Sequence, residues 1–347
     1  MARWTRRGIL AAGLSLTGCA VSGRPPLGPI YRPTRGSVDQ PPLVVIPGAF
    51  GSSLRDRRTG REIWPGTNPQ LLMSNYRGLE LDIDPATLEP VAGDVEANEI
   101  FREGLGRDFY GKVVDTLHDA GGYARGRVGQ PPVPGRRSYF VYLYDWRLDN
   151  VAAAHGLHEL IEQIRRDHGD PLMRVDILAH SNGGLLARYF ARYGTAGLPM
   201  EGRFEPTGAG ASSIRRLLLV GTPNLGTMQP VLGSIRGEEI GLRKIPQEVV
   251  ATCSGAPQMM PHPAIPWIID AQGRELALPL FDIDTWRENR WSVFSPHVVE
   301  RTIARHGGGA TGRSYLELLR EYMAKQLLRG RRFMESLAVP GGAGQFG

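Results

Sequence analysis

The sequence predicts an α/β protein, with a mostly parallel β-sheet, helices on both faces of the sheet, and a cap or lid insertion. Short apolar, β-branched runs alternate along the chain with segments of helical spacing. Several of these runs end directly at glycine or proline, as buried parallel strands do where they enter a turn. A later segment without clear periodicity interrupts the alternation. The 347 residues are enough for one large domain with a sizeable core.

Composition and charge narrow the functional classes. The chain is 41% hydrophobic and 22% charged, which is typical of a soluble globular protein. Its 45 glycines and 27 prolines favour many loops over a helical bundle. The net charge of +6 is modest, and no block of Lys and Arg is present that could follow a phosphate backbone. We therefore expect no nucleic-acid partner.

The first 18 residues have the pattern of a signal peptide. A basic start precedes the short apolar stretch Ile9–Leu16, which is too short to span a bilayer. Leu16-Thr17-Gly18-Cys19 resembles a bacterial lipobox, in which Cys19 would carry lipid, and Thr5–Leu10 resembles a twin-arginine export signal. The alternative is an ordinary cleaved signal in which Cys19 is incidental. The prediction is an exported, periplasmic or cell-surface lipoprotein, held at the membrane by lipidated Cys19.

Residues 19–41, rich in Pro, Gly and Arg, are predicted to be a tether. The only other cysteine is Cys253. If Cys19 is acylated, Cys253 has no partner in the chain, so we expect no disulfide framework. No motif surrounds Cys253, which favours a packed thiol over a nucleophile.

Residues 42–229 are predicted to form the core domain. The predicted strands and helices are, in chain order, a strand at Leu43–Ile46, a helix at Arg107–Ala120 with Phe109, Val113, Val114 and Leu117 on one face, a strand at Ser138–Tyr144, a helix at Val151–His168, a strand at Arg174–Ala179, a helix at Gly183–Tyr193 and a strand at Arg216–Val220. Residues 230–296, rich in Pro, Met and Trp, are predicted to be the cap or lid. Residues 297–347 contain two predicted helices.

Ser181 is the predicted nucleophile. It lies in Ala179-His180-Ser181-Asn182-Gly183, between a predicted strand and a predicted helix. Small residues on both sides of the serine allow a sharp turn, which exposes the Oγ and nearby backbone N–H groups to a developing oxyanion. The alternative is a serine that merely caps the helix.

The loop after the first strand is predicted to complete the oxyanion site. Pro47-Gly48-Ala49-Phe50-Gly51-Ser52 follows Leu43–Ile46, and its glycines permit close approach of the backbone. We expect the backbone N–H groups of Ala49 and Asn182 to form the oxyanion pair. The alternative is a glycine-rich strand end without this function.

Four motifs resemble the lecithin:cholesterol acyltransferase and phospholipid:diacylglycerol acyltransferase family of α/β-hydrolases. They are VVIPGAFGSSL, YDWR at Tyr144–Arg147, AHSNGG, and VGTPNLGT at 220–227; weaker likenesses are EIWPG at 62–66 and LFDIDTWRENRWSVFSP at 280–296. The resemblance covers roughly residues 41–296. It implies acyl transfer or hydrolysis through an acyl-serine, with a phospholipid or neutral lipid as the acyl donor.

The resemblance also suggests roles for residues near the predicted site. Phe50 and Trp64 are assigned to contacts with the acyl chain, although Trp64 could equally be plain packing. Asp145 and Arg147 are interpreted as a structural ion pair under the loops of the site, and Trp146 as a core residue.

The base and the acid are the difficulty. A serine hydroxyl needs a base, normally a histidine oriented by Asp or Glu, and in this fold both follow the serine in the sequence. The family's usual acid motif, close to GDGTV, is absent. We therefore expect the sheet to lack its last strands. The remaining candidates are His297 or His306 as base and Asp282 or Asp284 as acid.

Two functions from different classes follow. The first is a serine-dependent lipid acyltransferase, phospholipase or esterase, and the second is a catalytically inactive, membrane-tethered lipid-binding protein. No cofactor is expected. A metal site is not expected either, because no pair of histidines has the i, i+4 spacing with an intervening glutamate.

Overall fold

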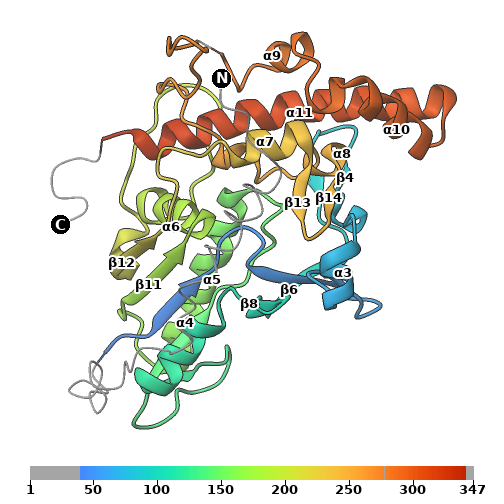
Figure 1. Ribbon diagram of the computed structural model, residues 1–347. Coiled ribbons are helices and arrows are strands. Elements are labelled where there is room, and N and C mark those ends of the chain that lie inside the picture. Colours follow the sequence, from blue (N-terminus) through green and yellow to red (C-terminus); the bar gives the residue numbers. More distant parts are fainter. Residues whose placement is uncertain (1–39, 277, 341–347) are drawn as a thin grey trace, which may run out of the picture.

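The computed structural model describes residues 40–276 and 278–340. The predicted signal segment, Cys19 and most of the predicted tether lie outside the described residues. The centre is a five-stranded parallel sheet with the strand order β12-β11-β1-β10-β9 (Figure 1). Its strands are β1 Leu43–Ile46, β9 Tyr123–Arg125, β10 Arg137–Val141, β11 Val175–His180 and β12 Ile214–Val220. The predicted α/β class is confirmed.

Alternate residues of β1 face two different layers. Val44 and Ile46 point into the larger core, which contains the apolar residues of α5 (Asn150–His168) and α6 (Asn182–Tyr193). Leu43 and Val45 point into a smaller core on the opposite face, with residues of α4 (Gly111–Asp115). The period of two in a strand therefore places helices on both faces of the sheet, as predicted.

The predicted helix at Arg107–Ala120 is shorter in the structure. Residues Arg107–Asp108 pair as β8 with β7 (Glu103–Gly104), so the helix begins only at Gly111, with the Asp108 carboxylate accepting a bond from the Lys112 N–H at 2.8 Å. Residues Thr116–Ala120 form a π-helical turn. Val114 and Leu117 are buried as predicted, but Phe109 is 49% exposed because it precedes the helix.

The predicted strand at Ser138–Tyr144 ends three residues early. β10 stops at Val141, after which the chain leaves the sheet and the Tyr144 hydroxyl donates to the Pro47 carbonyl at 3.0 Å. Tyr142 and Tyr144 are buried, which explains why their apolar run resembled a longer strand.

Smaller elements lie outside the central sheet. A three-stranded antiparallel sheet has the order β3-β2-β6, and the remaining pairs are β4-β5 and β7-β8. These elements are β2 Ser52–Asp56, β3 Glu62–Trp64, α3 Asn68–Met73, η2 Arg77–Leu79, β4 Asp82–Ile83, β5 Pro90–Val91, β6 Val95–Ile100, and the 3-10 turns η4 Ala211–Ser213, η5 Pro257–Met259 and η6 Ser292–Phe294.

The residues after β12 form helices and one hairpin above the sheet in Figure 1. They are α7 Gln229–Arg236, β13 Glu238–Ile240, β14 Arg243–Ile245, α8 Gln247–Val250, α9 Ile283–Glu288, α10 Pro296–Arg305 and α11 Gly309–Ala338. The long α11 packs against α6, and a second core forms around Trp286, Leu319 and Tyr322. Among the described residues, no helix is long and apolar enough to cross a membrane.

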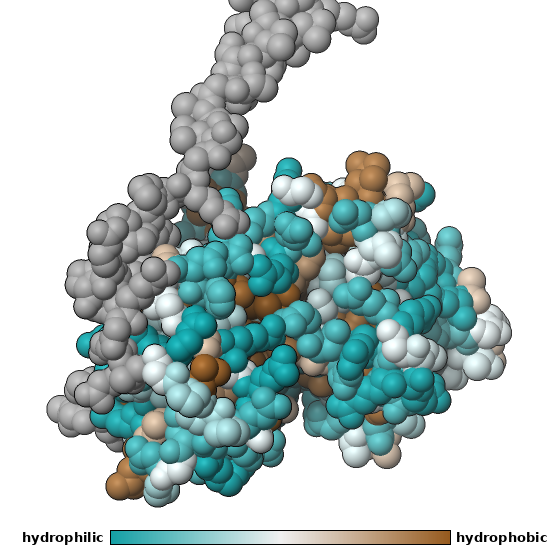
Figure 2. Space-filling model, turned by 90° about the horizontal axis from the view of Figure 1, so that it is seen from below, coloured by the Kyte–Doolittle hydropathy of each residue, from teal (hydrophilic) through white to brown (hydrophobic). Residues whose placement is uncertain are grey.

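β12 forms an open edge of the sheet. Leu218 is 47% exposed, Leu219 37% and Val220 49%, although adjacent residues of a strand point to opposite faces. The strand is therefore uncovered on both faces near its carboxyl end. Elsewhere the surface is more polar: hydrophilic side chains predominate on the face in Figure 2, and hydrophobic ones gather in a crevice near its middle.

Candidate active site

Ser181 sits at a strained turn between β11 and α6. Its backbone has φ 52° and ψ −125°, a conformation that residues with a side chain rarely adopt. Its N–H donates to the carbonyl of Val220 at the end of β12, at 2.9 Å. Ser181 makes no side-chain cap to α6, so the alternative of a helix-capping serine is not what the structure shows. The local geometry is that of a nucleophile elbow.

Glycines around the elbow allow this close packing. A Cβ atom added to Gly48 would lie 2.8 Å from the Ser181 Cβ, and one added to Gly183 would lie 2.5 Å from the Pro47 carbonyl oxygen. A Cβ atom on Gly184 would meet the Thr222 side chain. The small residues that the motif requires therefore serve contacts with β1 and with the loop after β12.

The two predicted oxyanion donors are free of other bonds. Within residues 40–276 and 278–340, neither the Ala49 N–H nor the Asn182 N–H donates to another group. Ala49 lines the cavity in front of Ser181, and Phe50 beside it has a positive φ of 62°. These observations fit the predicted oxyanion pair; its role in catalysis stays a prediction.

A buried polar network fixes the first residue of α6, and sequence reasoning did not find it. The Asn182 side-chain amide donates to the Tyr144 hydroxyl at 3.2 Å and exchanges bonds with Asn150 at 2.9 and 3.0 Å. The Asn150 N–H donates to Gln258 at 2.8 Å, and Gln258 bonds Asp149 at 2.6 Å. The only available signal was an asparagine inside an elbow, which is too common to be specific.

A second missed contact supports the oxyanion loop. The Tyr110 hydroxyl accepts from the Gly48 N–H at 2.8 Å and lies 2.7 Å from His180 Nδ1. Burial raises the pKa of Tyr110 and lowers the pKa of His180, so both groups are held in their neutral forms near neutral pH. Tyr110 therefore links the loop after β1 to the end of β11.

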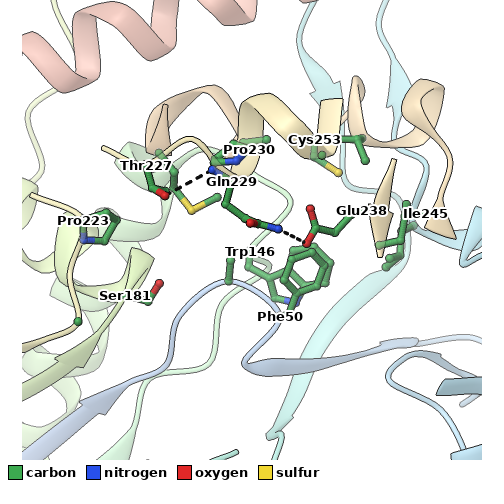
Figure 3. A pocket seen from close by; sticks show the side chains of 17 residues that line it. Phe50, Trp146, Ser181, Pro223, Thr227, Gln229, Pro230, Glu238, Ile245 and Cys253 are labelled. Atoms are coloured by element: carbon green, nitrogen blue, oxygen red, sulfur yellow. Dashed lines mark hydrogen bonds between the residues drawn. The ribbon is translucent and has the colours of Figure 1, made fainter. Parts of the chain in front are cut away.

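Ser181 opens into an apolar cavity of about 380 Å³. Figure 3 shows Ser181 at one side, Phe50 and Trp146 below, and residues of α7, β13 and β14 above. Other walls come from Leu79, Val250 and Met259. A cavity of mainly apolar lining suits an acyl chain.

Phe50 lines this cavity, whereas Trp64 does not. Trp64 is 2% exposed, donates its indole N–H to the Phe50 carbonyl at 2.9 Å, and packs against Phe50, Tyr76 and Phe101. The assignment of Trp64 to acyl-chain contact is thus corrected to packing behind Phe50. Trp146, which was interpreted as a core residue, is buried in the larger core and also supplies an aromatic wall of the cavity.

The ion pair within YDWR is confirmed. Arg147 is 1% exposed and binds Asp145 through two of its guanidinium nitrogens, Nε to Oδ1 at 2.9 Å and a terminal nitrogen to Oδ2 at 2.6 Å. It also donates to the Leu79 carbonyl at 3.3 Å. Arg147 therefore braces the segment that supports the cavity rather than entering it.

The predicted acid candidates do not meet Ser181. Asp282 caps α9 by accepting the Asp284 N–H at 2.9 Å, and Asp284 pairs with Arg287. Neither carboxylate lines the cavity. Both carboxylates are engaged within α9: that of Asp282 caps the start of the helix, and that of Asp284 forms an i, i+3 ion pair with Arg287.

The predicted base candidates also lie elsewhere. His297 Nδ1 is 2.8 Å from the Ser295 hydroxyl and its Nε2 is 3.3 Å from the Gln247 amide. His306 stacks on Tyr315 with ring centroids 3.5 Å apart, and its Nε2 lies 3.1 Å from Glu80 Oε1. In the described part of the chain, no histidine or carboxylate forms a hydrogen bond with the Ser181 Oγ.

Cys253 lines the cavity without the character of a nucleophile. Burial raises its pKa to about 12, so the thiol stays protonated at neutral pH. Its Sγ lies 3.6 Å from the Val249 carbonyl. Among the described residues, no group of His, Cys, Asp and Glu is arranged to hold a metal ion.

Comparisons with known proteins bear on the family and on the fold. Residues 134–273 match the family model described as lecithin:cholesterol acyltransferase. Among solved structures, a chain in "The crystal structure of Tle4-Tli4 complex" superposes with a TM-score of 0.54 at 16% identity, over 87% of this chain and 72% of that one. No curated protein matches the sequence.

The structural similarity supports the fold, and the family match supports an acyl-lipid acyltransferase or esterase in general. The matched segment contains YDWR, the AHSNGG turn and the loop after β12, which are three of the four motifs that carried the resemblance; the fourth, VVIPGAFGSSL, precedes it. Residues 134–273 are therefore similar to the lecithin:cholesterol acyltransferase family.

Proposed function

We propose that this chain acts on lipid esters through an acyl intermediate on Ser181. The single observation that supports this best is the strained backbone of Ser181, which would have no purpose in a serine that only packs. The apolar cavity in front of it would hold the acyl chain, and the free N–H groups of Ala49 and Asn182 would stabilise the oxyanion.

In the proposed reaction, the Ser181 Oγ attacks the ester carbonyl carbon and the bond to the alcohol oxygen breaks. The acyl-serine is then released to water or to an acceptor alcohol, which distinguishes hydrolysis from transfer. The donor class that fits the cavity and the family is a phospholipid or a neutral lipid. The Oγ proton ends on the oxygen of the leaving alcohol, and a base is needed to carry it there.

A second function is favoured by one observation. No imidazole in the described part of the chain hydrogen-bonds Ser181, so the elbow is present without an assembled base. The corresponding proposal is a lipid-binding protein that holds acyl chains in the cavity without turnover. Its attachment to a membrane through Cys19, outside the cytoplasm, is part of both proposals and rests on the sequence pattern alone.

A fluorophosphonate probe separates the two functions. The purified protein is treated with the probe, and Ser181→Ala and Ser212→Ala serve as the test variant and a matched control, since Ser212 is exposed and distant in sequence. Labelling that Ser181→Ala removes and Ser212→Ala keeps supports the acyl-serine. Absence of labelling in folded protein contradicts turnover by this chain.

Lipid binding is tested independently of chemistry. Displacement of a fluorescent fatty acid by decanoate is compared between wild type, Ala256→Phe, which reduces the cavity, and Ala271→Phe on an exposed loop. Loss of binding only in Ala256→Phe, with unchanged thermal unfolding, supports a lipid cavity. Equal binding in all three proteins contradicts both proposed functions.

A further inference from the structure

The cavity contains one feature that acyl-chain binding does not explain. Of the described residues that line it, only Glu238 has a charged side chain; most others are apolar. Glu238 is the first residue of β13 and lies across from Ile245 of β14, which also faces the cavity. An apolar residue at this position would continue the lining without any cost of desolvating a carboxyl group.

The carboxyl group is held in a defined position. Glu238 Oε1 accepts a hydrogen bond from the Gln229 side-chain amide at 2.9 Å, drawn as a dashed line in Figure 3. A Cβ atom added to Gly233 would lie 2.5 Å from Oε2, so a glycine in α7 makes the space for this oxygen. Three residues of α7 and β13 thus combine to present one carboxyl group at the cavity wall.

Its charge is not balanced by a neighbouring cation. Among the residues that the structure describes, no Lys, Arg or His forms an ion pair with Glu238, whereas the adjacent Glu239 pairs with Lys244 at 2.9 Å. Burial, with a smaller contribution from Glu239, raises the pKa of Glu238, and the hydrogen bond from Gln229 opposes this. The cavity therefore favours the neutral carboxyl group relative to water.

We propose that Glu238, positioned by Gln229, determines specificity by accepting a hydrogen bond from a hydroxyl group of the lipid bound in the cavity. We expect a hydroxyl rather than an ammonium group, because a cation pairs best with an ionised carboxylate, whereas this cavity favours the neutral carboxyl group of Glu238. Ser181 and Glu238 face the same cavity, so one ligand contacts both when its ester and its hydroxyl are separated along the molecule (Figure 3). This inference rests on the proposed function only in requiring a lipid in the cavity.

The test uses three decanoyl esters that share one acyl chain. Monodecanoin carries two hydroxyls, methyl decanoate none, and decanoylcholine a cation. Binding to the purified protein is followed at pH 7 by tryptophan fluorescence, to which Trp146 in the cavity wall contributes. Wild type should bind monodecanoin about tenfold more tightly than methyl decanoate, as one hydrogen bond to a carboxyl group would give.

Two variants distinguish recognition from structural support. Glu238→Leu should weaken the binding of monodecanoin to the level of methyl decanoate, and should leave the binding of methyl decanoate unchanged or tighter. Glu239→Leu, the exposed neighbour on the same hairpin, should keep the wild-type ratio. If Glu238 had a purely structural role, Glu238→Leu would change the affinities for both esters by the same factor. Thermal unfolding verifies that each variant is folded.

The remaining outcomes contradict either the role of Glu238 or the lipid cavity itself. Equal binding of the first two esters by wild type, or an unchanged ratio in Glu238→Leu, overturns the role of Glu238 while the lipid cavity stands. Tighter binding of decanoylcholine than of monodecanoin also overturns it, because the site would then select a cation. Failure of methyl decanoate itself to bind overturns the lipid cavity, and with it the proposed function.

Discussion

The two edges of the central sheet are built in opposite ways. β9 is three residues long, contacts the turn at Thr116–Ala120, and ends at Arg125, which binds Glu99 at 2.8 and 3.0 Å. β12 is seven residues long and exposes apolar side chains on both of its faces. Edge strands are usually short, charged or covered, since an open edge can pair with another chain. β9 meets this requirement and β12 does not.

The two halves of the sheet also contribute different parts of the proposed active site. The half that ends at β9 is braced by the buried Asp145–Arg147 pair, whereas the half that ends at β12 carries Ser181. Ser181 is bonded to the last residue of β12 at the open edge. The strained turn at Ser181, the proposed nucleophile, is thus present while the edge strand next to it is exposed, and among the described residues no base is hydrogen-bonded to Ser181.

The largest expected effect lies in the braced half. Arg147→Leu leaves the Asp145 carboxylate in a largely buried position without its partner, and should lower the free energy of unfolding by about 3–5 kcal/mol. Chemical denaturation measures this loss. The double variant Asp145→Leu/Arg147→Leu should lose less than Arg147→Leu alone; an equal or greater loss would show that packing, not the unpaired charge, dominates.

A smaller effect is expected at the elbow. Gly184→Ala places a methyl group against Thr222 and should cost about 1–3 kcal/mol through overpacking. It should also shift Ser181 and reduce fluorophosphonate labelling wherever wild type reacts. Gly197→Ala, where an added Cβ atom meets nothing within 4 Å and φ is not positive, is a control for glycine replacement without a clash. Equal losses in the two variants would argue against crowding at the elbow.

Substitutions at the open edge should barely change stability but should change association. Leu218→Lys removes an exposed apolar side chain, so we expect a stability change within about 0.5 kcal/mol and less self-association at high protein concentration. Light scattering and denaturation measure the two quantities. Ala124→Lys, at a buried residue of β9, should instead destabilise the fold. If Leu218→Lys were as damaging as Ala124→Lys, β12 would not be an open edge.

The smallest effect concerns pH and Glu238. Its folded-state pKa is raised above the ordinary glutamate value of 4.5, so the native protein holds this proton more tightly than the unfolded chain. Stability should therefore decline slightly as pH rises from 4.5 through the raised pKa. Thermal unfolding across this range should show a flatter profile for Glu238→Gln than for wild type, and identical profiles would contradict the assigned shift.

Much of the core followed from local patterns in the sequence. The strand Leu43–Ile46 was predicted with its observed bounds, and α5 and α6 each begin one residue earlier than predicted. These elements have strong periodicity and clear stop signals, such as Gly169 with its positive φ after α5. The helix predicted at Arg107–Ala120 failed at its start because its first residues pair with β7, a contact that no local pattern encodes.

By itself, the sequence determined the α/β class, the tight turn at Ser181 and the Asp145–Arg147 pair, because each depends on residues close together in the chain. Only the tertiary structure decided that Trp64 packs behind Phe50, that Tyr110 and Asn150 support the site, and that Glu238 faces the cavity. It also decided that His297, His306, Asp282 and Asp284 lie away from Ser181. These outcomes depend on contacts between residues distant in sequence, which are set by how the helices and strands pack rather than by any local spacing.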